Sequence, residues 1–135
     1  MDWKACQRSS LVKTIKVDSN LIKSLVKESA KKLRTQNQIL LSDESASSKI
    51  TLAYDAVRMV LDAVAIKCGY KIYNHECFRA FLKEVLKESS LGDEFDKYRK
   101  IRNAINYYGK EVLAVVSEKI ISELIDFHRK IRRFL

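Results

Sequence analysis

The sequence predicts an all-α protein, an up-and-down bundle of four to five helices. Proline, which breaks helix interiors, is absent from the 135 residues. Apolar residues recur at helical spacing through long stretches that are separated by short breaks. Hydrophobic residues make up 47% of the chain and charged residues 32%, which is typical of a globular domain. We therefore expect one helical bundle over residues 18–135, preceded by an N-terminal extension over residues 1–17.

The N-terminal extension is the part that the pattern defines least. Leu11–Val17 alternates loosely and is compatible with a short extended piece or with a weak helix. Asp18 then has the position of an N-cap, because its side chain can accept from the first free amides of a helix. A helix over about 19–41 follows. Its outer face carries a basic stripe with one residue per turn: Lys23, Lys27, Lys31 and Arg34.

The strongest apolar stripe lies in the next helix, over about 44–68, and we expect this helix at the core. Ser42–Ser45 marks the break before it, and Gly69 directly after it has the expected C′ position. Residues 70–73 are predicted to be a short connector. Because no convincing second strand is visible, we expect no sheet.

Capping and turn residues place the three remaining helices. Asn74 is a plausible N-cap for a helix that Ser89–Gly92 ends. The next helix begins near Asp93, where acidic residues in the first turn favour the helix dipole, and ends or kinks at Gly109. The last helix has apolar positions over 112–131, and it ends in a basic cluster that suits a helix C-terminus.

The net charge is +9 and is distributed unevenly. Residues 1–41 hold nine basic and three acidic side chains, residues 42–92 hold seven of each, and residues 93–135 hold ten and seven. Excess base towards both ends is compatible with nucleic-acid or nucleotide binding. It is equally compatible with a requirement for solubility alone.

The cysteines and the N-terminus indicate where the protein resides. Cys6, Cys68 and Cys77 show no metal-ligand spacing, and we expect buried free thiols in a reducing compartment, although Cys68 and Cys77 could approach each other. Met1–Lys4 opens a polar stretch rather than a signal peptide, and no apolar run is long enough for a membrane span. We therefore expect a soluble cytoplasmic protein without a metal or cofactor.

The stretch Tyr98–Tyr108 divides into two faces when it is read as a helix. One face is an apolar stripe of Tyr98, Ile101, Ile105 and Tyr108. The other face carries bases and carboxamides but no carboxylate: Arg99, Arg102, Asn103, Asn106 and Lys110. Solvated helix faces usually mix both signs of charge, so this face is predicted to meet phosphate or another subunit. The alternative is an ordinary solvated basic face.

Three segments together resemble the HEPN family (higher eukaryotes and prokaryotes nucleotide-binding): Ala53–Arg58, Gly69–His75 and Tyr98–Gly109. The resemblance covers about residues 18–135. It implies an all-α bundle that usually dimerises. Many family members are metal-independent ribonucleases with a composite site across the dimer, and many pair with a small nucleotidyltransferase as toxin and antitoxin. Others are nucleotide-binding or accessory modules.

The family motif is an Arg, often followed by Asn, with a His a few residues later. Arg102 and Asn103 match its first part, but residues 104–109 contain no His. Arg102 can stabilise a phosphorane, Asn103 can orient the substrate, and Tyr107 would have to replace the His. Tyrosine is a poor base near neutral pH, since its ordinary pKa is about 10. The resemblance therefore implies RNA or nucleotide binding more directly than cleavage.

Two histidines lie elsewhere in the sequence, His75 near the start of one helix and His128 in the last helix. Each is expected to be a structural residue, with rescue of the missing motif His as the alternative.

The sequence leaves three candidate functions. The first is a dimeric module that binds RNA or nucleotide through Arg99, Arg102, Asn103 and Asn106, or docks a nucleotidyltransferase. The others are a divergent ribonuclease toxin and a ligand-free dimerisation domain.

Overall fold

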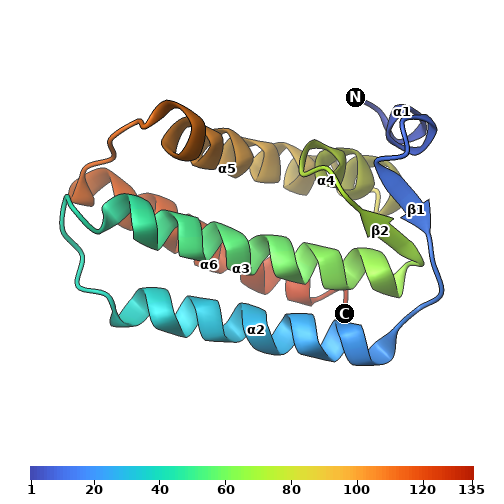
Figure 1. The fold of residues 1–135 in the computed structure, drawn as a ribbon, viewed down its shortest axis with the longest axis horizontal. Coiled ribbons are helices and arrows are strands. Elements are labelled where there is room, and N and C mark those ends of the chain that lie inside the picture. Colours follow the sequence, from blue (N-terminus) through green and yellow to red (C-terminus); the bar gives the residue numbers. More distant parts are fainter.

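The computed structural model describes residues 1–135 and confirms the all-α prediction. In chain order the elements are α1 (Trp3–Arg8), β1 (Val12–Thr14), α2 (Ser19–Gln38), α3 (Ala46–Lys67), β2 (Tyr70–Ile72), α4 (Glu76–Ala80), the π-helical segment η1 (Phe81–Val85), α5 (Ser89–Tyr108) and α6 (Ala114–Arg132). The four long helices α2, α3, α5 and α6 run alternately up and down (Figure 1). None of the helices combines the length and the apolar character that crossing a bilayer requires.

Helix α3 is the centre of the bundle, as its apolar stripe predicted. It contacts α2, α5 and α6, and Figure 1 shows it between α2 and α5. From Ala53 to Ile66 most of its side chains are buried, on nearly every face of the helix. A helix that is apolar all round belongs in the interior, because each face gains free energy when it is removed from water.

A chain of aromatic rings fills the space between α3, α4, α5 and α6. The ring centroid of Phe95 lies 5.8 Å from that of Tyr54, 5.7 Å from that of Phe78 and 6.4 Å from that of Phe127. Tyr98 continues the chain, with a centroid 5.5 Å from that of Phe127. These contacts hold α5 against the core and so fix the direction in which its polar face points.

The N-terminal extension is more ordered than the sequence indicated. Val12–Thr14 forms β1, which pairs antiparallel with β2 in the register Val12 to Ile72. The expected absence of a second strand was therefore wrong, since the connector at 70–73 supplies one. Both strands are too short to show a period in the sequence, and only their pairing identifies them.

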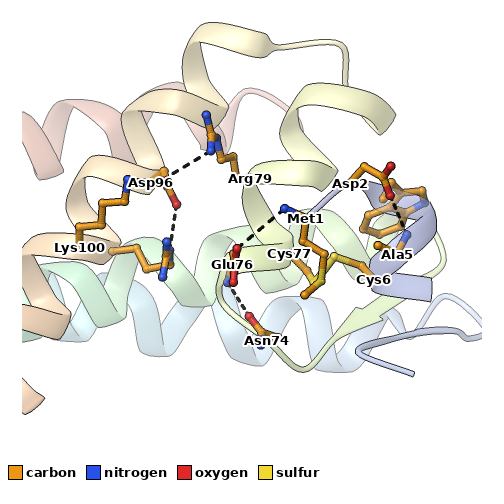
Figure 2. A network of polar contacts seen from close by, with 12 residues as sticks. Met1, Asp2, Ala5, Cys6, Asn74, Glu76, Cys77, Arg79, Asp96 and Lys100 are labelled. Carbon is orange, nitrogen blue, oxygen red and sulfur yellow. Dashed lines mark hydrogen bonds and ion pairs between the residues drawn. A yellow bond between two sulfur atoms is a disulfide. The ribbon is translucent and has the colours of Figure 1, made fainter. Parts of the chain in front are cut away.

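The cysteine prediction was also wrong. Cys6 on α1 and Cys77 on α4 form a disulfide with Cα atoms 6.1 Å apart, and both are fully buried (Figure 2). Cys68, expected to be buried, is the one free thiol and is exposed. The pairing depends on the docking of α1 against α4, which brings together residues 71 positions apart.

Several helix ends follow the predicted caps, and one does not. Asp18 Oδ1 accepts from the Leu21 amide at 3.0 Å, and Gly109 ends α5 in the left-handed conformation with φ 61°. The predicted break at Ser89–Gly92 is instead the first turn of α5. Gly92 allows the start of α5 to lie close to Lys83, because a Cβ at this position would be 2.6 Å from Cγ of Lys83. The chain turns earlier, at Lys87, where φ is 60°.

Replacing Phe95 by Ala tests the aromatic core. Phe95 is fully buried and touches three other aromatic rings, so we expect Phe95→Ala to lower the free energy of unfolding by about 3–5 kcal/mol. Urea denaturation followed by circular dichroism measures the loss. Tyr108→Ala is the matched control, because Tyr108 is 85% exposed and should change stability by no more than about 0.5 kcal/mol. Equal effects of the two changes would contradict the described packing.

Candidate functional site

A polar pocket of about 440 Å³ lies between α5 and the segment that joins β2 to α4. The α5 wall is made by Arg99, Arg102, Asn103 and Tyr107, and the opposite wall by Tyr73, Asn74, His75 and Glu76. Four of the residues predicted to form a site thus lie in one depression. The structure adds a histidine to them that lies 27 positions earlier in the chain than Arg102.

Arg102 lies between two aromatic rings. Its Cζ atom is 5.5 Å from the ring centroid of Tyr54 beneath it and 5.7 Å from that of Tyr107. Its Nη1 atom lies 3.4 Å from Oδ1 of Asn103 and 3.4 Å from the Tyr107 hydroxyl, both long for hydrogen bonds. The aromatic contacts therefore hold the guanidinium in place more firmly than its polar contacts do.

Arg102 has no acidic partner. It forms no ion pair with any carboxylate, and its Nε atom is buried without a hydrogen-bond acceptor. A buried donor that lacks a partner costs free energy, and the cost is larger for a charged group. The guanidinium can recover this free energy from an oxyanion that enters the pocket, since arginine binds carboxylate and phosphate oxygens in a forked geometry.

His75 is fixed from below by a tyrosine of the core. Its Nδ1 atom lies 3.0 Å from the hydroxyl of Tyr54, and this is the only hydrogen bond of the ring. Tyr54 is fully buried on α3, and burial raises the pKa of its phenol, so the hydroxyl stays neutral. The contact orients the imidazole and leaves its Nε2 atom without a protein partner.

The electrostatic environment keeps His75 neutral. Burial, followed by the positive charges of Arg58, Arg102 and Arg99, lowers the pKa of His75 to about 4. The folded state therefore binds fewer protons than the unfolded state, in which the pKa is about 6.5. This neutral ring stabilises the fold above about pH 6.5, and the contribution is lost as the pH falls towards about 4. At neutral pH the imidazole therefore carries no charge.

Arg99 differs from Arg102 because it has a counter-charge. Its Nε donates to Oδ1 of Asp96 at 2.9 Å, and Asp96 also pairs with Lys100 at 3.2 Å and with Arg79 at 3.8 Å (Figure 2). Burial raises the pKa of Asp96, but the hydrogen bonds from Arg99 and Lys100 outweigh it and lower the pKa overall. The predicted face without carboxylates is thus interrupted by an aspartate from the preceding turn.

The opposite wall is anchored to the start of α4. Oδ1 of Asn74 accepts from the amide of Glu76 at 2.8 Å, although the N-cap of α4 is His75, one residue later than the sequence predicted. The carboxylate of Glu76 lies 3.9 Å from the amino group of Met1 (Figure 2). The single carboxylate in the pocket wall therefore has a cation beside it, and the net character of the pocket remains basic.

Other predicted residues lie outside the pocket. Asn106 borders a separate depression beside Ser47 and Thr51 of α3. Tyr108, which the apolar stripe placed on the core side, is 85% exposed, because α5 extends past the packed part of the bundle at this end. Lys110 lies beside an apolar depression between α5 and α6.

His128 belongs to a different part of the bundle. It is buried on α6, and its Nε2 atom lies 2.7 Å from Oγ of Ser29 on α2. That hydroxyl donates to the carbonyl of Ala56 at 2.6 Å, so the imidazole must supply the proton of the shared contact. Burial, with a smaller effect of Arg132, lowers the pKa of His128 to about 4. His128 therefore ties α6 and α3 to α2 and does not reach the pocket.

Sequence reasoning missed the roles of His75 and Tyr54. His75 follows a plausible N-cap, which favours a structural interpretation, and Tyr54 falls within the apolar stripe of the central helix. The hydroxyl of a tyrosine in such a stripe needs a partner when it is buried, and this is the one signal that pointed beyond packing. The identity of the partner depends on how the connector folds back over α3.

No three His, Cys, Asp or Glu side chains are grouped closely enough to hold a metal ion. Comparisons of the chain with protein-family models, with curated proteins and with solved structures found no match.

The two histidines provide an internal test of the electrostatics. We expect Arg102→Ala to raise the pKa of His75 from about 4, because a positive charge near the ring is removed. The pKa of His128 should stay at about 4, since Arg102 is not among the charges that affect it. An NMR titration of the imidazole protons, assigned with His75→Gln and His128→Gln, measures both. A shift of both rings, or of neither, would contradict the described pocket.

Proposed function

We propose that the chain is an HEPN-like helical module that binds RNA or a nucleotide through this pocket. The supporting observation is the state of Arg102, a part-buried guanidinium without a carboxylate and with an unpaired Nε. Asn103 beside it and the neutral ring of His75 opposite supply further hydrogen-bonding groups. A phosphate group would satisfy the unpaired donor and would neutralise the cluster of guanidiniums.

The proposal includes self-association. An apolar depression of about 270 Å³ lies beside the end of α5, lined by Ile101, Ala104, Val112, Leu113, Val116 and Ile120 among others. Consecutive apolar side chains at the start of α6 are exposed beside it, with Leu113 at 49%, Val115 at 76% and Val116 at 52%. Exposed apolar side chains that are grouped in this way are typical of association surfaces. We place a second copy of the chain here, and a nucleotidyltransferase is the alternative occupant.

Removing the guanidinium tests the proposed function. We expect Arg102→Ala to weaken binding of a short RNA, or of a nucleoside monophosphate, roughly 10- to 100-fold, since charge-assisted hydrogen bonds are lost. Fluorescence anisotropy or calorimetry measures the affinity. Arg133→Ala is the matched control, because Arg133 lies at the exposed C-terminal end of α6, away from the pocket. Unchanged affinity in Arg102→Ala would contradict the proposal.

The position of His75 favours a second candidate function, metal-independent cleavage of RNA. In this reaction the 2′-oxygen bonds to the adjacent phosphorus while the bond from phosphorus to the 5′-oxygen breaks. The proton of the 2′-hydroxyl passes to Nε2 of His75, which can accept it in the tautomer whose Nδ1–H donates to the Tyr54 hydroxyl oxygen. The departing 5′-oxygen takes a proton from water. Arg102 stabilises the charge on the phosphorane. Tyr54 orients the imidazole, and a phosphate bound beside the ring would raise its pKa from about 4 and so make it a stronger base.

The histidine distinguishes binding from cleavage. We expect His75→Gln to abolish cleavage in the presence of EDTA while RNA affinity changes less than about threefold, because glutamine keeps hydrogen bonds but cannot accept a proton. Gel analysis of a labelled RNA measures cleavage, and His128→Gln is the control outside the pocket. Cleavage that survives His75→Gln but not Arg102→Ala would remove His75 from the reaction. If neither the unaltered chain nor any of the variants cleaves the RNA, the cleavage function is ruled out and the binding function is retained.

A further inference from the structure

Six exposed basic side chains outside the pocket follow one another along the chain from β1 to α2, and we call them the basic track. Its members are Lys13 on β1, Lys16 in the segment between β1 and α2, and Lys23, Lys27, Lys31 and Arg34 on α2. All six are exposed. Of these, only Lys31 has an acidic partner, Glu28 at 3.0 Å. Five of the six cations are therefore free to meet an anion.

The basic track begins at the pocket. Nζ of Lys13 lies 5.9 Å from the ring centroid of Tyr73, and Tyr73 forms part of the pocket wall. From β1 the chain descends along one end of the bundle to α2, which forms the side of the molecule opposite α5 (Figure 1). The α2 members then follow one another along the helix at intervals of one turn.

Stability of α2 itself does not account for these charges. Lys23, Lys27 and Lys31 lie four residues apart, and like charges at this spacing destabilise a helix. Asp18 is engaged as the N-cap, and Glu28, the one carboxylate within α2, pairs with Lys31. The cations therefore cost the isolated helix stability, and of those on α2 only Lys31 has a compensating partner within the chain.

The composition of the α2 outer face favours a polyanionic strand as its partner. Between the cations it carries uncharged hydrogen-bonding side chains, namely Asn20, Ser24, Thr35 and Gln38, all exposed. Arginine, lysine, amides and hydroxyls are the groups that contact phosphate and sugar in nucleic-acid complexes. The only large apolar side chain exposed on α2 is Leu21, at 37%. Protein interfaces and membrane-bound helices need an apolar centre, which this face lacks.

We propose that the basic track binds the phosphodiester backbone of an RNA strand that continues outward from the pocket. This inference rests on the proposed function, because it takes the pocket as the point from which the strand extends. It predicts that long RNAs bind more tightly than short ones and with a steeper dependence on salt. The additional affinity comes from the release of counterions at each neutralised phosphate.

The test compares two RNA probes on the full chain. An unstructured RNA of about 30 nucleotides can reach α2, whereas a probe of about 3 nucleotides fills only the pocket. We expect the triple change Lys23→Gln, Lys27→Gln, Arg34→Gln to weaken binding of the long RNA ~10-fold. The slope of log affinity against log salt should become shallower by about 2, roughly 0.7 for each cation removed from a single strand. Short-probe affinity should not change.

The matched control removes the same charge elsewhere. Lys4, Lys87 and Lys119 are exposed, lie outside β1, α2 and the segment between them, and have no ion-pair partner. Their triple change to Gln should therefore leave the long-RNA slope near that of the unaltered chain. Circular dichroism checks that both triple variants are folded. Equal losses in the two variants, or an unchanged slope in the α2 variant, would overturn the inference.

Further outcomes separate this inference from the proposed function. If Arg102→Ala loses the short probe while the α2 variant keeps full affinity for the long RNA, the pocket binds RNA and the basic track does not. If the α2 variant alone loses the long RNA and Arg102→Ala loses neither probe, the basic track binds and the pocket proposal fails. Loss of binding to phosphatidylserine vesicles, with long-RNA affinity unchanged, would assign α2 to a membrane surface and overturn the inference.

Discussion

The buried hydroxyl of Tyr54 is the constraint on which the candidate site depends. Helix α3 lies at the centre of the bundle, so a polar atom on it must find its partner inside the protein. The Tyr54 hydroxyl finds Nδ1 of His75 at 3.0 Å, while its ring supports the guanidinium of Arg102 at 5.5 Å. One core side chain thus fixes two groups from different elements. The precision of the pocket comes from α3, although no atom of α3 is part of its lining.

The protonation of His75 on one wall of the pocket depends on arginines of other elements, so neither wall alone determines the charge of the pocket. Guanidiniums from α3 and α5 add to burial and keep the imidazole of His75 neutral at physiological pH. Asp96 neutralises Arg99 but does not reach Arg102, so one cation is structural and its neighbour remains free. This difference between two arginines three residues apart makes Arg102 the group most suited to bind an anion.

The bundle could be predicted from the sequence because long periodic stripes and caps are local signals, as at Asp18, Gly69 and Gly109. Short elements were missed, since the β1–β2 pair and the Cys6–Cys77 bond exist only through contacts between distant segments. The candidate site likewise combines residues that local signals identify with a residue that only long-range contacts bring in. Arg102, Asn103 and Tyr107 lie on one helix and could be found by spacing, whereas His75 joins them only through the fold. The contact of Arg99 with Asp96 was not predicted, because Asp96 lies one helical turn before the polar face that begins at Arg99.

Histidine chemical shifts in the presence of ligand test the central claim most directly. With ¹⁵N-labelled histidine, addition of a nucleoside monophosphate or a short RNA should shift the ring resonances of His75 and raise its pKa, because a phosphate anion near the ring favours the imidazolium. The resonances of His128, which lies outside the pocket, should not change. Ligand binding that leaves His75 unaffected, or that shifts both histidines equally, would contradict the claim that phosphate binds between Arg102 and His75.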